Sequence, residues 1–173
     1  MTKFKKALIT TAALATAALC SLTAYAAVNI VWVNTYEDGV VVASVGEALG
    51  SLKGEQVSKT VGNMTTYYTH TTAATASTQV LVMNAVNNSN ETKYMSGFVS
   101  VCGRDKNIIW SHHQASSGNV SAHMPLVASK SFNNSSLPSG KYYLAYQSSI
   151  FKSNNSHAPV AYSSRLDEPF TVN

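Results

Sequence analysis

Apolar and polar residues alternate along most of the chain after residue 27, and this alternation predicts short β-strands. In residues 28–36, Ile30 and Trp32 fall on one side and Val31 and Val33 on the other, which is the two-residue period of a half-buried strand. The acidic and glycine residues at 37–39 predict a turn into a second strand at 40–45, so the two strands form a hairpin. Further strands are predicted at residues 59–69, 79–86, 93–102, 107–113, 120–128, 141–149 and 168–172.

The segments between these predicted strands carry turn-forming residues. Residues 87–90, 103–106, 116–119 and 132–140 are rich in Asn, Ser, Gly or Asp, which tolerate tight turns and left-handed backbone. Residues 46–56 predict a loop, or one helical turn at most. Helix-forming residues never recur at the spacing of an amphipathic helix. About eight or nine short strands with this spacing predict an all-β fold, an antiparallel β-sandwich, with a small β-barrel as the alternative.

The end of the chain carries one more specific pattern. A turn at Leu137-Pro138-Ser139-Gly140 precedes a strand rich in tyrosine, and the last strand follows at residues 168–172. This pattern resembles the last two strands of many immunoglobulin-like bacterial domains, over about 35 residues. The resemblance implies an immunoglobulin-like sandwich in which a tyrosine near the turn bonds back to the corner backbone. It implies no activity, because folds of this kind serve many functions.

Residues 1–26 have the three parts of a secretory signal. Lys3, Lys5 and Lys6 precede a short apolar run that ends in Ala24-Tyr25-Ala26, a small-residue exit typical of signal cleavage. The apolar run is shorter than the roughly 18–20 residues that span a bilayer, and no comparable run follows. We therefore expect a secreted, extracellular protein, or a periplasmic one in a Gram-negative cell, with one domain at residues 27–173 and no transmembrane segment. The leader is typical of bacteria.

Charge and cysteine content narrow the classes of function. The chain has 12 Lys+Arg and 8 Asp+Glu, but three of the lysines belong to the leader, so the processed protein is close to neutral. Its basic residues are scattered rather than clustered, which argues against nucleic acid as a partner. Cys20 lies in the leader, and its position leaves a lipidated precursor as the alternative to an ordinary secretory signal. Cys102 is then the one cysteine of the processed protein, so it has no internal disulfide partner. We expect Cys102 to be buried as a small hydrophobic residue.

The chain lacks the motifs of common catalytic and metal sites. It contains neither Gly-x-Ser-x-Gly nor His-Glu-x-x-His, so the sequence predicts no enzyme and no cofactor. A hairpin turning at residues 117–119 would bring His112 toward His123, the best metal candidates. Zinc and copper normally need three or four ligands, and two histidines are too few, so no metal site is predicted. A small metal-binding secreted protein is kept as the third alternative for the function.

Aromatic residues are the most suggestive functional feature. Tyrosine and tryptophan are more numerous than a small core can hide, and the doublets Tyr67-Tyr68 and Tyr142-Tyr143 place one ring on each face of a strand. Tyrosine combines a large contact area with a polar tip, which suits stacking on glycans or recognition of proteins. The alternative is that these rings only pair across strands.

These rings define the predicted function: non-catalytic binding, or extracellular assembly, with a protein or glycan at a cell surface as the partner. The predicted binding residues are Tyr67, Tyr68, Trp110 and Tyr142. The runner-up is a membrane-active toxin or bacteriocin-like protein. Residues 65–78 are rich in Thr and Ala, as in the hairpins that pore-forming proteins insert, although the alternation breaks at residues 71–74. No pattern in the sequence sets an oligomeric state.

Overall fold

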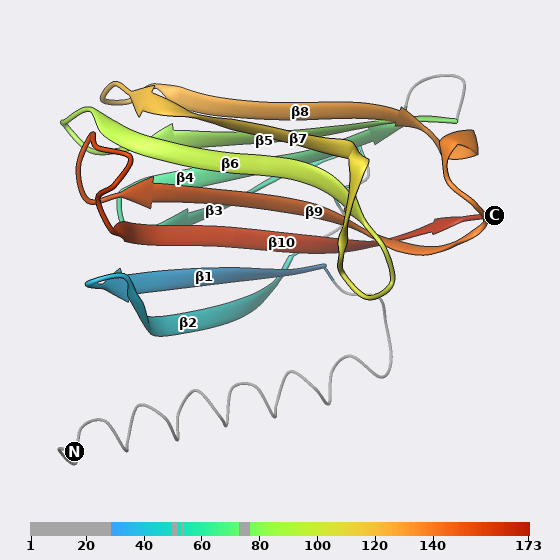
Figure 1. Ribbon diagram of the computed structural model, residues 1–173, viewed down its shortest axis with the longest axis horizontal. Coiled ribbons are helices and arrows are strands. Elements are labelled where there is room, and N and C mark those ends of the chain that lie inside the picture. Colours follow the sequence, from blue (N-terminus) through green and yellow to red (C-terminus); the bar gives the residue numbers. More distant parts are fainter. Residues whose placement is uncertain (1–28, 50–51, 53, 73–76) are drawn as a thin grey trace, which may run out of the picture.

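Two antiparallel sheets packed face to face make up the fold (Figure 1). The computed structural model describes residues 29–49, 52, 54–72 and 77–173, so the expected signal at residues 1–26 lies outside the described residues. One sheet has six strands in the order β2-β1-β10-β9-β6-β7, and the other has four in the order β3-β4-β5-β8. The predicted β-sandwich is confirmed. The strands are β1 (Asn29–Glu37), β2 (Val40–Leu49), β3 (Gln56–Val61), β4 (Met64–Thr72), β5 (Thr78–Asn87), β6 (Lys93–Cys102), β7 (Ile108–Val120), β8 (Pro125–Asn133), β9 (Gly140–Phe151) and β10 (Val160–Val172).

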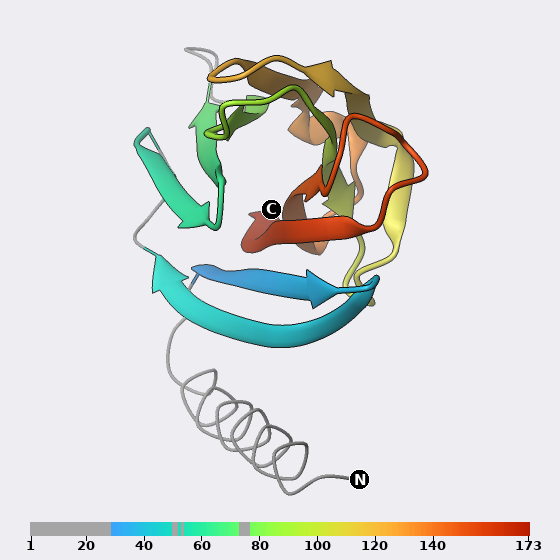
Figure 2. The ribbon, with the colours of Figure 1, turned by 90° about the vertical axis from the view of Figure 1, so that its left-hand side faces the viewer.

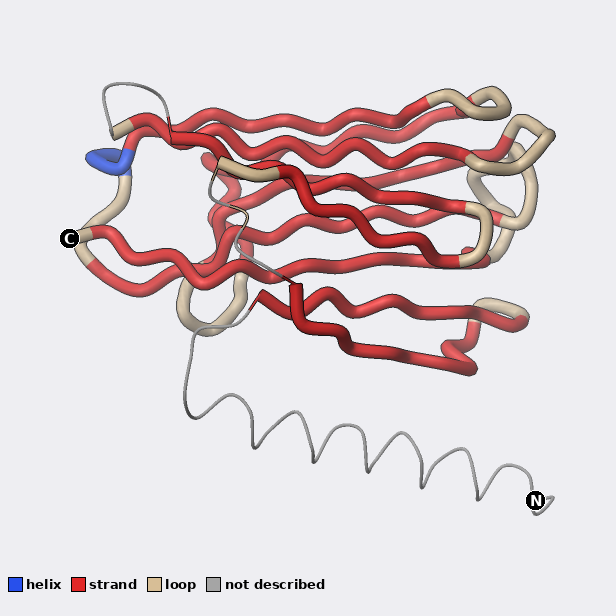
Figure 3. The backbone as a smooth tube through the Cα atoms, turned by 180° about the vertical axis from the view of Figure 1, so that it is seen from behind, coloured by secondary structure: helices blue, strands red, loops and turns tan. Residues whose placement is uncertain are grey.

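Most of the described backbone is strand, with one short 3-10 turn at Asn134–Ser136 (Figure 3). The hairpin of β1 and β2 is as predicted, but the strand expected at residues 59–69 is two strands. Gly62, with φ 53°, turns the chain between β3 and β4. Gly62-Asn63 is a two-residue hairpin turn, since Val61 pairs with Met64; this dipeptide is a turn signal in the sequence that the prediction of one strand overlooked.

The turn predicted at residues 116–119 is wrong, and so is the strand predicted at 120–128. β7 continues through the Ser-Gly-Asn segment to Val120, and Ser117 pairs with Ser96 of β6 in regular register. Turn-forming residues permit a turn but do not require one, and the ladder with β6 supplies their backbone hydrogen bonds here. The chain reverses at residues 121–124 instead, where His123 has φ 62°.

The two sheets bury alternate residues of their strands against each other, and Figure 2 shows the layers end on. Val31 and Val33 face inward and Ile30 and Trp32 outward, so these pairs lie on opposite sides as predicted, and the structure shows which side is buried. Burial of this apolar surface is the main force that holds the sheets together. The large apolar residues with no exposed surface are Leu52, Met64, Leu81, Met83, Met95, Leu144, Ile150 and Leu166.

A row of polar contacts also crosses the core, between β4 on one side and β9 and β10 on the other. Thr66 Oγ1 lies 2.6 Å from Ser148 Oγ, the Tyr68 hydroxyl bonds to the Ser164 hydroxyl, and His70 Nδ1 lies 3.0 Å from Glu168 Oε1. We call these six residues the polar seam. All six are buried, and each makes at least one hydrogen bond to the facing sheet, which offsets the cost of removing it from water.

The corner before β9 has the geometry that the resemblance implied. The Tyr142 hydroxyl donates a hydrogen bond of 2.8 Å to the carbonyl oxygen of Pro138. This bond ties the start of β9 to the preceding loop. The corner tyrosine is therefore confirmed, while the immunoglobulin-like classification stays a prediction.

Candidate binding face

The four predicted binding residues lie in four different environments. Trp110 on β7 is 75% exposed, and Tyr67 is half-buried on the outer face of the four-stranded sheet. Tyr68 is 0% exposed, so its ring belongs to the polar seam and is out of reach of a partner. The hydroxyl of Tyr142 is used in the corner. Among these four, only the Trp110 ring is mostly in contact with solvent.

Trp110 begins a row of three rings on the outer face of the six-stranded sheet. The centroid of its ring lies 5.0 Å from that of His113, which in turn lies 5.3 Å from the ring of Phe98. The row runs obliquely from β7 to β6, because Phe98 pairs with Ala115 and Ser100 pairs with His113 in the ladder. Contacts of this length are typical of packed aromatic pairs. The row is therefore a pre-formed aromatic strip that ends in an exposed indole.

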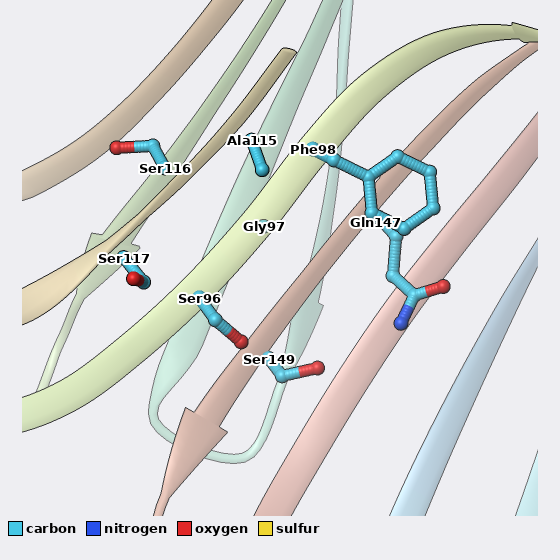
Figure 4. Close-up of a pocket in the computed structure, with 8 residues that line it drawn as sticks. All are labelled: Ser96, Gly97, Phe98, Ala115, Ser116, Ser117, Gln147 and Ser149. Carbon is cyan, nitrogen blue, oxygen red and sulfur yellow. The ribbon is translucent and has the colours of Figure 1, made fainter. Parts of the chain in front are cut away.

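A shallow hollow of about 340 Å³ lies beside Phe98 (Figure 4). Its floor is Gly97 and its sides come from β6, β7 and β9, which are neighbours in the sheet. Gly97 cannot be replaced without a clash, since a Cβ there would lie 2.6 Å from the backbone oxygen of Gln147. The lining residues are Ser96, Gly97, Phe98, Ala115, Ser116, Ser117, Gln147 and Ser149.

The chemistry of this hollow is polar and neutral. Four of its lining residues carry hydroxyl groups, one carries a carboxamide and one an aromatic ring, and none carries an ionisable side chain. Hydroxyl and amide groups both donate and accept hydrogen bonds. The hollow can therefore orient a neutral ligand that is rich in hydroxyl groups. It holds no proton donor or acceptor of the kind that general acid–base catalysis uses.

On the same face, beside the hollow, two cations share one carboxylate. Arg165 donates to Asp167 through Nε at 3.1 Å and reaches Gln147 Oε1 at 3.4 Å. Lys106 lies 3.4 Å from Asp167 Oδ2 and 5.1 Å from the centre of the Tyr143 ring. The carboxylate thus faces two cations, and Arg165 fixes the amide of Gln147 at the edge of the hollow.

Trp110 was predicted from the sequence, but the residues around it were not. Phe98, Gln147 and His113 lie far apart in sequence and come together only through the pairing of β7 with β6 and of β6 with β9. The alternation within β6 did carry a signal, because it places Phe98 opposite to the buried Val99. Ser117, Ser96 and Ser149 form a row across β7, β6 and β9, but this row follows from the sheet order and left no signal in the sequence.

The proposed approach of His112 to His123 is wrong. His112 is buried beside Ser136 and Phe132, whereas His123 lies beyond the far end of β7. Eight residues of extended strand from His112 to Val120 span roughly 26 Å. Within residues 29–49, 52, 54–72 and 77–173, no group of three or more His, Cys, Asp or Glu residues is placed to hold a metal ion.

Cys102 at the end of β6 is buried, as expected, and burial raises the pKa of its thiol, with Arg165 opposing the rise. Because the thiolate is the reactive form, we expect alkylation of Cys102 to be at least about 100-fold slower in the native protein than in the unfolded chain. Mass spectrometry of the Cys102 peptide after timed iodoacetamide treatment, with and without urea, measures this ratio. Equal rates in both conditions would show that the thiol is accessible.

Comparisons with known proteins place this chain in no family. No family model matches it, and no curated protein matches it. Among solved structures, the crystal structure of chicken MD-1 complexed with lipid IVa is similar at 10% identity and a TM-score of 0.25, over 67% of this chain and 98% of that one. A likeness this slight bears on neither the fold nor the function of this chain.

Proposed function

We propose that this protein is a secreted, non-catalytic binding protein that holds a neutral carbohydrate on the outer face of its six-stranded sheet. The observation that carries the proposal is the row of Trp110, His113 and Phe98 beside a neutral, hydroxyl-lined hollow. A sugar ring presents a flat apolar face and a rim of hydroxyl groups. Aromatic rings stack on such a face, and neighbouring polar groups bond to such a rim.

The distribution of charge favours a neutral ligand over a charged one. The hollow itself has no ionisable group, and Asp167 beside it is already paired with Arg165 and Lys106. An anionic polysaccharide would need unpaired cations in a cluster, whereas the cations nearest the hollow, Arg165 and Lys106, both contact Asp167. The ligand class is therefore a neutral glycan of a cell wall or cell surface.

Replacement of Trp110 by alanine is expected to weaken glycan binding by about tenfold or more, which corresponds to about 1.4 kcal/mol. The indole is mostly exposed, so its loss removes contact area with little effect on folding. Binding is measured by co-sedimentation with insoluble neutral glucans, mannans and galactans, and with a polyuronate as the charged comparison.

Tyr67→Ala is the matched control, because Tyr67 lies on the outer face of the other sheet. It should bind like the unmodified protein. Equal losses in both variants, or retention on the polyuronate alone, would contradict the proposal. Binding to none of the neutral glycans would contradict it as well.

The membrane-active alternative makes a different prediction, namely release of dye from liposomes by the purified protein. Residues 65–72 of its Thr-rich segment lie in β4, which pairs with β3 on one side and β5 on the other. Those pairings would have to break before the segment could enter a bilayer. Among the described residues, no helix is both long enough and apolar enough to span a membrane.

A further inference from the structure

We propose that the protein forms a two-fold dimer in which β2 pairs with β2 of a second copy. β2 is the outer strand of the six-stranded sheet, and no described strand pairs with its far side (Figure 1). Its backbone N–H and C=O groups on that side are a template for one more strand. The proposal concerns the opposite margin of the sheet from β7, so it is independent of the proposed function.

The composition of β2 lacks the features that normally protect a free edge. Exposed edge strands are usually interrupted by lysine or proline, and β2 contains neither. Its one charged residue, Glu47, is bound to Lys59 of β3 and so is held toward the other sheet. Three of the six large exposed apolar residues of the described chain also lie on this strand: Val40, Val41 and Val45.

The strand is complementary to itself in one antiparallel register. A two-fold axis beside Val45 places the two Val45 side chains opposite each other, Ser44 opposite Gly46, and Ala43 opposite Glu47. No like charges meet in this register. Residues 43–49 pair one to one with β1, and the bulge residue of β2 is Val42, just before this run. In the self-paired register residues 43–47 are regular on both copies, and their pairing makes about five hydrogen bonds.

The dimer has one consequence that does rest on the proposed function. A two-fold axis perpendicular to the joined sheets leaves both outer faces on the same side. The two aromatic rows would then face one glycan surface together. Binding by both sites at once would raise the apparent affinity, although each site makes the same contacts as before.

Sedimentation velocity of the full chain from about 1 to about 200 μM tests the dimer. We expect a concentration-dependent dimer, and we expect Val45→Lys to abolish it, because two like charges would then lie opposite each other across the axis. Val45 is 56% exposed, so the fold should tolerate the lysine. Val127→Lys is the matched control, since Val127 on β8 is 48% exposed and should keep the dimer.

Oxidative crosslinking tests the register. Val45→Cys should give a disulfide-linked dimer, because paired residues in a ladder have the Cα separation that a disulfide needs. Val40→Cys should give no more disulfide-linked dimer than the unmodified chain, although Val40 is 66% exposed. In this register the two copies of residue 40 lie roughly 30 Å apart. A monomer at every concentration, a dimer that survives Val45→Lys, or equal crosslinking by both cysteines would overturn the proposal.

Discussion

Replacement of Glu168 by alanine is expected to lower the free energy of unfolding by about 3–5 kcal/mol, because two buried groups lose their acceptor and a cavity is left. Glu168 is buried, its Oε1 lies 3.0 Å from His70 Nδ1, and its Oε2 accepts from the Tyr146 hydroxyl at 3.5 Å. One side chain therefore bonds to both sheets. Urea unfolding followed by circular dichroism measures the loss.

The neighbouring Asp167 provides the matched control for this experiment. Asp167 is also a paired carboxylate on β10, and its side chain is 14% exposed, but its cations Lys106 and Arg165 are 56% and 33% exposed and so remain in contact with solvent. Exposed ion pairs contribute at most about 1 kcal/mol, so Asp167→Ala should cost far less. Glu168→Gln keeps the shape of the side chain and should fall between the two. Equal losses for Glu168→Ala and Asp167→Ala would show that the buried end of the polar seam does not hold the sheets together.

The polar seam also marks the limit of prediction from the hydrophobic pattern. Alternation correctly separated the two sides of β1, and residues 95–99 of β6 follow the same two-residue period. It failed on β4, because the inward residues Thr66, Tyr68 and His70 are polar and would normally be expected at the surface. They are buried because Ser148, Ser164 and Glu168 of the facing sheet bond to them. These partners lie 82 to 98 residues away in sequence, and no local pattern could pair them.

The candidate site could be predicted only in part for a similar reason. Trp110 was predicted as a binding residue from its side-chain type alone, but the hollow requires three strands in the order β9-β6-β7. Sheet order is a long-range property, and the prediction of a turn at residues 116–119 would have removed the segment that forms one side of the hollow. The aromatic doublets indicated that some rings face outward, yet they did not show which ring of each doublet is buried.

Stability is expected to fall by about 3 kcal/mol between pH values of about 10 and about 12 through Tyr68 alone. Burial raises the pKa of Tyr68 from 10.0 to about 12, with the hydrogen bond to Ser164 opposing part of the rise. Below a pH of about 10 both the folded and the unfolded protein keep the proton, so the contribution is fully present there. Above it the unfolded chain loses the proton first, which favours unfolding until the folded state also ionises.

Tyr68→Phe isolates this contribution, because phenylalanine keeps the ring and removes the titrating group. We expect the variant to be about 1 kcal/mol less stable near neutral pH, through the lost bond to Ser164, and to show a smaller alkaline loss. Some loss should remain, because burial and then the charge of Glu168 raise the pKa of Tyr146 well above its usual value. Urea unfolding at a series of pH values gives both quantities. Tyr67→Phe, which alters the opposite face of β4, should keep the full loss, and an alkaline loss in Tyr68→Phe as large as in the unmodified protein would show that Tyr68 is not its source.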